Sequence, residues 1–187
     1  MAHITLPENV PGIIGPMIAY PETERHLNGL AEALLRGPSS LTPAERETIA
    51  AYVSSGNECF FCTQAHAAAA RELYGAECTV VDQVLGDAGT APLSKKMKAL
   101  LLIADKVRRD GRLVTSEDVE SARSAGADDK ALHDTVLIAA AFCMFNRYVD
   151  GLATWAPRDT AVYKGIGEML VQKGYVNSIR EATGAGA

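Results

Sequence analysis

The sequence has no hydrophobic run long enough to cross a membrane. Its longest apolar stretch, from Val136 to Phe145, is well short of the ~18 apolar residues that a spanning helix needs. At the N-terminus, Met1 to Thr5 lack the basic segment and the following apolar segment that are typical of a secretory signal. We therefore expect neither a membrane partner nor a secretory signal.

Positive charge is also sparse. The chain has 18 lysines and arginines against 23 aspartates and glutamates, which gives a formal net charge of −5. Lys95, Lys96 and Lys98 form the one notable basic cluster. Because nucleic acids and anionic lipid surfaces are bound by extended basic patches, neither is expected as a partner.

Cysteine is too rare for a scaffold held together by disulfides, since the chain has four cysteines in 187 residues. Together with the missing secretory signal, this predicts a cytoplasmic protein. In the cytoplasm a Cys-x-x-Cys pair is more often catalytic or metal-binding than a structural crosslink.

Strand signals are nearly absent as well. Alanine is abundant and most segments show helical spacing, so we predict an all-α protein with residues 1–187 in a single domain. Prolines at positions 7, 11, 16 and 21 predict an extended arm over 1–22 that lies against another part of the molecule. The region 156–187 is predicted to hold the last helix and a tail that is frayed from residue 182. The helices are predicted at about 22–36, 42–55, 58–74, 79–85, 94–110, 115–126, 128–151 and 158–173.

The segment from Cys59 to His66 points most directly to chemistry. It places two thiols and an imidazole at i, i+3 and i+7, within roughly 60° of one helical face. Two cysteines three apart on a helix have Cα atoms about 5 Å apart, which suits a disulfide. At the start of a helix the unpaired N–H groups and the dipole favour a thiolate, so the pKa of one thiol is expected to fall. His66, one turn beyond Cys62, would take or return a proton.

A histidine usually needs a partner that fixes its tautomer. Residues 42–75 are predicted to form a helical hairpin, whose first helix begins with a capping box and a proline at Thr42 and Pro43. In this hairpin Glu47 lies on a stripe of small residues that faces a similar stripe on the helix of His66. Glu47 is therefore the best candidate to orient His66.

Glu47, Cys59-x-x-Cys62 and His66 together resemble the Glu…CxxCxxxH signature of the alkylhydroperoxidase D-like branch of the carboxymuconolactone decarboxylase family. The motif region covers about residues 42–75. The prolines before it and the helix after Trp155 are similar to the longer "peroxidase-related" members.

This resemblance implies an all-α, homo-oligomeric helical bundle with a CxxC-bearing hairpin, which reduces peroxides in antioxidant defence. Carried over to this sequence, Cys62 attacks the peroxide, Cys59 is its disulfide partner, and Glu47 and His66 are the proton relay. We expect a small-molecule peroxide substrate, an external dithiol reductant, and no haem, flavin or nicotinamide. The best-known peroxidase members have a histidine immediately before the second cysteine. Here that position is Phe61, which changes how the thiol would be activated.

Two other functions remain open. In one, Cys59, Cys62, His66 and Glu47 form a zinc-binding or redox-sensing module, although structural zinc usually has a second Cys or His pair. In the other, Glu47 and His66 are the acid and base of a carboxymuconolactone decarboxylase-like enzyme of small-molecule catabolism. The thiols are then bystanders, although members that act as decarboxylases generally lack the CxxC.

Three further residues carry no specific prediction. Cys78 and Cys143 are interpreted as small hydrophobic residues. Arg147 is either the partner of a carboxylate, a residue of a subunit boundary, or a plain surface arginine.

Overall fold

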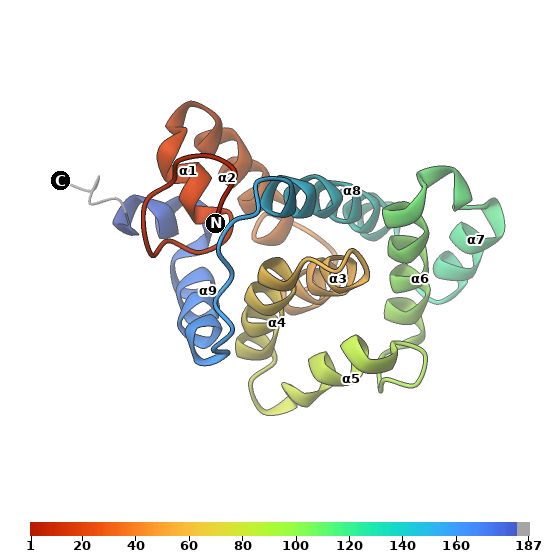
Figure 1. Cartoon of the computed structure of the whole chain (residues 1–187). Coiled ribbons are helices and arrows are strands. Elements are labelled where there is room, and N and C mark those ends of the chain that lie inside the picture. Colours follow the sequence, from red (N-terminus) through yellow and green to blue (C-terminus); the bar gives the residue numbers. More distant parts are fainter. Residues whose placement is uncertain (183–187) are drawn as a thin grey trace.

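The computed structural model describes residues 1–182 of the chain, with side chains to residue 177, and all its regular structure is helical (Figure 1). The predicted all-α class is confirmed, and within residues 1–182 there is no strand. None of the helices described there is long and apolar enough to span a bilayer. The elements are α1 (Ile14–Ala19), α2 (Pro21–Leu35), α3 (Pro43–Gly56), α4 (Phe60–Tyr74), η1 (Gly75–Glu77), α5 (Thr79–Asp87), α6 (Lys95–Arg109), η2 (Gly111–Leu113), α7 (Ser116–Ser124), α8 (Asp129–Gly151) and α9 (Ala161–Ala182).

The helices α3 and α4 lie at the centre of the bundle and pack against each other (Figure 1). Helix α9 covers α4 on one side, and α8 packs on α3 and on α6. Small residues permit the close approach of α3 and α4, because their buried faces are rich in alanine. The main apolar core contains Leu35, Ile49, Val53, Met97, Leu100, Leu101, Ile103, Ile138 and Phe142, each of them buried.

Side-chain caps start these helices close to where the sequence predicts them. Thr42 and Thr115 each complete a capping box, in which the threonine hydroxyl accepts a bond from the backbone three residues later and the acidic residue there bonds back. Ser94 and Asp128 cap α6 and α8 without such a return bond. Each side chain accepts one hydrogen bond, from the backbone N–H three residues later.

The prediction of an extended arm over 1–22 is only partly right. Residues 14–19 form α1, and α2 already begins at Pro21. Pro16 is compatible with helix here because it occupies the third helical position, where its missing N–H would have no intrahelical acceptor. The preceding residues do lie along another segment, since the backbone N–H of Gly12 bonds to the carbonyl oxygen of Trp155 at 2.8 Å.

The last helix also differs from its prediction. It begins at Ala161, and helical structure resumes beyond Gly174, whose φ of 70° and ψ of −169° break it. Gly174 therefore closes one helical segment, as predicted, but another follows it. The predicted frayed tail from residue 182 falls almost entirely on residues 183–187, which lie outside the described residues.

Candidate active site

The carboxylate of Glu47 is the centre of a buried polar cluster. Glu47 lies on α3 and is fully buried. Its Oε2 lies 2.8 Å from Nδ1 of His66 on α4, and its Oε1 lies 2.7 Å from Nη2 of Arg36 at the end of α2. The hydroxyl of Tyr175, on α9, donates to the same Oε1 at 2.6 Å. The structure thus brings together the predicted pair, Glu47 and His66, and adds Arg36 and Tyr175.

The environment of Glu47 favours its charged form. Burial has the largest single effect and raises the pKa of Glu47, but the hydrogen bond and charge of His66, together with Arg36 and Tyr175, outweigh it. The pKa of Glu47 is therefore held below its ordinary value. A carboxylate that stays ionised in the interior fixes the ring of the histidine beside it.

The imidazole of His66 is held on several sides. Its Nδ1 faces Glu47 and lies 3.2 Å from the hydroxyl oxygen of Tyr175. The edge-on ring of Phe142 packs against it, with centroids 4.5 Å apart. Because the carboxylate accepts the Nδ1 proton, Nε2 is the nitrogen available for proton exchange. His66 also lines a cavity of about 70 Å³ whose walls are mostly apolar and include Met17.

Sequence reasoning missed Arg36 and Tyr175. Arg36 stands at the end of a predicted helix, where a basic residue is ordinarily explained by the helix dipole. Tyr175 follows Gly174, beyond the predicted end of the last helix. The break at Gly174 turns the chain so that the backbone N–H of Tyr175 donates to Oε2 of Glu32 at 2.6 Å. Only the docking of α2 on α3 and of α9 on α4 and α2 brings the two side chains to Glu47.

We expect Gly174→Ala to lower the free energy of unfolding by about 1–3 kcal/mol. Its φ of 70° and ψ of −169° lie in a region that essentially only glycine adopts. A Cβ there would also lie 2.6 Å from Oε2 of Glu32. Gly165→Ala is the matched control on the same helix. A Cβ at that position meets nothing within 4 Å, so it should raise stability by about 0.5–1 kcal/mol. Urea unfolding of both variants checks the opposite signs.

The two thiols lie at the start of α4. Cys59 is the N-cap residue and Cys62 is one turn further along. The main chain of Cys59 is fixed on both sides: its N–H donates to the carbonyl oxygen of Ser54 at 3.0 Å, and its carbonyl oxygen accepts from the N–H of Thr63 at 3.0 Å. Both cysteines are free and buried, and they belong to the same apolar cluster. The two thiols are therefore neighbours in the interior.

The pKa of the Cys59 thiol is raised, whereas a helix start considered alone would lower it. The hydrogen bond with Cys62 has the largest effect, and burial and the charge of Cys62 add to it, so the pKa of Cys59 is raised strongly. The fall in pKa that is expected for one of the two thiols is therefore not found at Cys59. The raised pKa favours the protonated form of the Cys59 thiol.

A shell of apolar side chains covers the dithiol. Cys59 and Cys62 are 0% and 3% exposed, and they pack with Phe61, Val149 and Tyr163. Phe61, which directly precedes Cys62, is buried in this shell. Among the described residues no hydrogen bond links His66 to either thiol.

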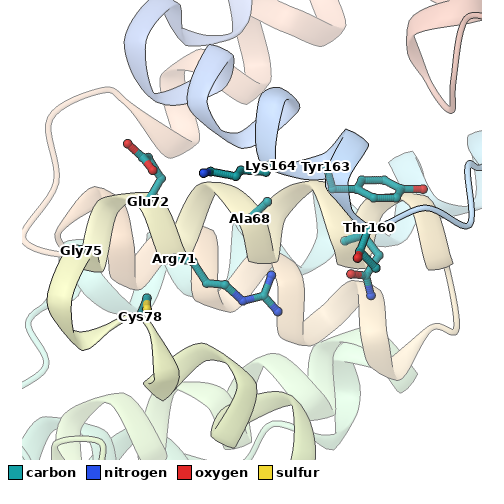
Figure 2. Close-up of a pocket in the computed structure, with 9 residues that line it drawn as sticks. Ala68, Arg71, Glu72, Gly75, Cys78, Thr160, Tyr163 and Lys164 are labelled. Carbon is teal, nitrogen blue, oxygen red and sulfur yellow. The ribbon is translucent and has the colours of Figure 1, made fainter.

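Tyr163 separates the dithiol from an open cleft. The cleft has a volume of about 550 Å³ and lies between α4, α9 and the turn that leads into α5, as Figure 2 shows. Tyr163 lines it, and its ring also packs on Phe60 and Phe61. Its hydroxyl donates to the carbonyl oxygen of Pro157 at 2.9 Å. Burial is the largest of the effects that raise the pKa of Tyr163 to about 12, so the hydroxyl stays protonated.

The remaining cysteines and Arg147 lie away from the dithiol. Cys78 lines the far end of the cleft (Figure 2). Cys143 is half-buried and donates to the carbonyl oxygen of Arg108 at 3.6 Å. Arg147 is exposed. Its Nη1 donates to the carbonyl oxygen of Cys143, one turn earlier on the same helix, at 2.9 Å.

The residues considered for zinc are not gathered into a ligand set. In the part of the chain that the structure describes, no group of three or more His, Cys, Asp or Glu side chains could hold a metal ion. Both oxygens of Glu47 already face Arg36, Tyr175 and His66.

Comparison with known proteins places this arrangement in a family. The profile of the carboxymuconolactone decarboxylase family matches residues 21–106. An uncharacterized peroxidase-related protein from Silicibacter sp. TM1040 is 31% identical, with a TM-score of 0.75 over 83% of this chain and 80% of that one. An uncharacterized peroxidase-related protein from Ralstonia eutropha JMP134, described as an alkylhydroperoxidase AhpD core, is 29% identical, with a TM-score of 0.75 over 84% and 81% of the two chains. No functionally curated protein matches the chain significantly. The chain therefore belongs to the carboxymuconolactone decarboxylase family, and it is similar to the peroxidase-related, alkylhydroperoxidase D-like proteins of that family.

Proposed function

We propose that the protein is a cysteine-based peroxidase, or more generally a dithiol–disulfide oxidoreductase, that reduces a small peroxide with Cys59 and Cys62. The observation that carries this proposal is the pair of free, neighbouring thiols at the start of α4. One turn deeper on the same helix lies a histidine fixed by a buried carboxylate. The peroxidase-related neighbours support the same assignment.

In the first step Cys62 attacks one oxygen of the peroxide. The Sγ–O bond forms, the O–O bond breaks, and the other oxygen leaves as an alcohol or water. His66 takes the proton of Cys62 and returns it to the leaving oxygen, directly or through one water molecule. Cys62 is then a sulfenic acid. Glu47 keeps the Nδ1 of His66 protonated throughout, so that Nε2 exchanges the proton.

In the second step Cys59 attacks the sulfenic acid sulfur. The Sγ–Sγ bond forms and the S–O bond breaks, which releases water and leaves a disulfide. Two thiols of an external reductant return the pair to its reduced state and become a disulfide themselves. The packing of the two thiols in one buried cluster supports this choice of partners.

The burial of both thiols requires a movement before a peroxide enters. Tyr163 borders both the dithiol shell and the cleft of Figure 2. We assign the access route to this side chain, because its displacement would join the thiols to an existing open space.

The proposal includes a homo-oligomer in the cytoplasm. Val136, Leu137 and Met144 are apolar side chains exposed along α8, and they support a contact with a second copy of the chain. Light scattering of the purified protein measures the subunit number.

The activity is tested with Cys62→Ser, which should abolish peroxide consumption in the presence of dithiothreitol. Cys59→Ser should leave a sulfenic acid on Cys62 that dimedone traps, and no internal disulfide should form. Cys78→Ser is the matched control, since Cys78 lies across the cleft, and it should retain wild-type rates. Full peroxide consumption by Cys62→Ser would contradict the proposal.

A second candidate is supported by the cavity beside His66. That cavity of about 70 Å³ is lined by His66, and neither cysteine is among its walls. It suits acid–base chemistry on a small substrate by Glu47 and His66, as in a decarboxylase-like enzyme. Such turnover should survive Cys62→Ser and be lost in His66→Gln. Cys62→Ser therefore separates the two functions, because it should abolish peroxide consumption.

A further inference from the structure

The cavity of about 70 Å³ beside His66 lies where four helices meet. α1, α2, α4 and α9 all contribute to its walls. Most of the lining is apolar, with Met17 from α1, Ala65 from α4 and Leu170 from α9 among the side chains. Asn28 from α2 and His66 from α4 bring hydrogen-bonding groups to the same space. An apolar cavity with a few converging polar groups is the usual form of a site for a small molecule.

Asn28 is the polar exception on the buried face of α2. The other buried residues of this helix are Ala31, Leu34 and Leu35, whereas Asn28 is only 4% exposed. Its Nδ2 donates to Oε1 of Glu24 at 2.5 Å, but no residue whose side chain is described donates to its Oδ1. Burying a polar group without a partner costs stability. For packing alone, a leucine would therefore serve better at this position.

A second buried asparagine shows the contrast. Asn146 on α8 is 1% exposed, and both ends of its amide are used. Its Oδ1 accepts from Nδ2 of Asn57 at 2.9 Å, and its Nδ2 donates to Oγ of Ser54 at 3.0 Å. Asn146 thus joins two neighbouring segments. Asn28 has a partner at one end only and borders a cavity, which leaves its Oδ1 for a molecule bound there.

His66 supplies the second polar contact. Its Nδ1 faces Glu47, so Nε2 lies on the opposite edge of the ring. A hydroxyl group suits this pair because it both donates and accepts. It can donate to Nε2 of neutral His66. When His66 is protonated, the hydroxyl can accept from Nε2 and donate to Oδ1 of Asn28.

The walls also limit the charge and the size of a ligand. Among the described residues, no lysine, arginine, aspartate or glutamate lines the cavity, and the nearby charges of Glu47 and Arg36 pair with each other. An ionic ligand would therefore find no counter-charge. An apolar cavity of about 150 Å³ can hold benzene, so a volume of about 70 Å³ suits roughly three non-hydrogen atoms.

We propose that this cavity binds a small uncharged molecule that carries an O–H group on one or two carbon atoms, and that Asn28 and His66 hold the O–H group. A short alcohol and a short hydroperoxide share this chemistry. Phe61 lines the cavity and packs with Cys62, so a hydroperoxide held there would lie one side chain from the thiol. Only the hydroperoxide form of this inference rests on the proposed function, because neither cysteine lines the cavity.

The test is a titration of the reduced full-length protein with ethanol at pH 8, followed by NMR through the ring protons of His66. His66→Gln lacks these signals and so identifies them. They should shift with saturation at millimolar ethanol, since a ligand of roughly three non-hydrogen atoms binds at best in the sub-millimolar range. Ethylammonium and acetate are of similar size but charged, and they should give no saturable shift.

Three variants show whether the ethanol lies in this cavity. Asn28→Leu should weaken binding about tenfold through the lost hydrogen bond, while its urea midpoint stays the same or rises. Asn146→Leu is the matched control: it should lower the urea midpoint and leave the affinity for ethanol unchanged. Ala65→Leu adds three carbon atoms at the cavity wall and should abolish the saturable shift.

Competition then assigns the source of the ligand. If ethanol inhibits the consumption of methyl hydroperoxide competitively, with an inhibition constant equal to its Kd, a hydroperoxide uses the same site. If ethanol binds without inhibiting, the site is one for an alcohol. If the protein consumes no methyl hydroperoxide, the proposed function fails while the binding of ethanol still stands.

Four results would overturn the inference itself. The first is a wild-type protein whose His66 signals do not saturate with ethanol, and the second is equal binding of the charged analogues. The third is wild-type affinity in Asn28→Leu, and the fourth is a saturable shift that persists in Ala65→Leu. The two variants stand on different helices, so a failure of one to fold leaves the other to decide.

Discussion

Glu47→Gln is expected to lower the free energy of unfolding by about 3–5 kcal/mol, which is typical when one partner of a buried ion pair is removed. Glutamine has nearly the same size, so the change removes charge and not volume. Arg36, whose Nη2 lies 2.7 Å from Glu47 and whose guanidinium lies over the ring of Tyr175, would stay in the interior without its counter-charge. Urea unfolding followed by circular dichroism at pH 7 measures the loss.

The pH dependence of this loss follows from the lowered pKa of Glu47. A carboxyl whose pKa is lower in the folded than in the unfolded state stabilises the fold above its unfolded pKa, which is about 4.3 for glutamate. That contribution is lost as the pH falls through the lower folded pKa. The gap between wild type and Glu47→Gln should therefore be full at pH 7 and shrink on acidification below about pH 4. A gap that stays constant down to pH 3 would contradict the assignment.

Asp110→Asn provides the control for both measurements. Asp110 pairs with Arg112 at 2.6 Å, but the pair lies on the surface. Water and salt screen such a pair, so the substitution should leave the unfolding midpoint in place. A comparable loss in the two variants would mean that burial at Glu47 is not the cause.

Local sequence patterns were enough to predict most of the fold. Capping residues such as Thr42 and Ser94 act within one turn of the chain, so the helix starts can be read without tertiary structure. The pairing of Glu47 with His66 was also accessible, because two consecutive helices with facing alanines have few ways to pack. The roles of these residues in catalysis stay a prediction until the variants are measured.

Contacts between distant segments were not accessible from the sequence. Tyr175 is 128 positions from Glu47, and Val149, which packs in the same cluster as Cys59, is about 90 positions from it. Neither contact follows from a helical period, since each depends on how α9 or α8 docks onto the central hairpin. The raised pKa of Cys59 also depends on packing that the sequence does not give. A helix start considered alone favours a thiolate, whereas burial and the neighbouring Cys62 oppose it.

Tyr163→Ala is expected to make the dithiol react about 100-fold faster with a thiol reagent such as Ellman's reagent. The ring packs with Cys59 and Cys62 on one side and lines the cleft on the other. Truncating a buried aromatic side chain typically costs about 3–5 kcal/mol of packing. Much of that loss should appear as easier local opening over the thiols, and about 2.7 kcal/mol corresponds to a hundredfold change in rate. The measurement uses a protein that also carries Cys78→Ser and Cys143→Ser, so that only Cys59 and Cys62 can react with the reagent.

Two companion variants separate access from general destabilisation. Tyr163→Phe keeps the ring but loses the bond to the carbonyl oxygen of Pro157, so its thiols should react at a rate between those of wild type and Tyr163→Ala. Trp155→Ala removes a larger ring that is 52% exposed, and it should leave the reaction rate unchanged. If Tyr163→Ala opened the dithiol only by unfolding the protein, urea would accelerate its reaction as steeply as it promotes global unfolding. A shallow dependence on urea would indicate local opening, and an unchanged rate in Tyr163→Ala would mean that peroxide reaches Cys62 by another route.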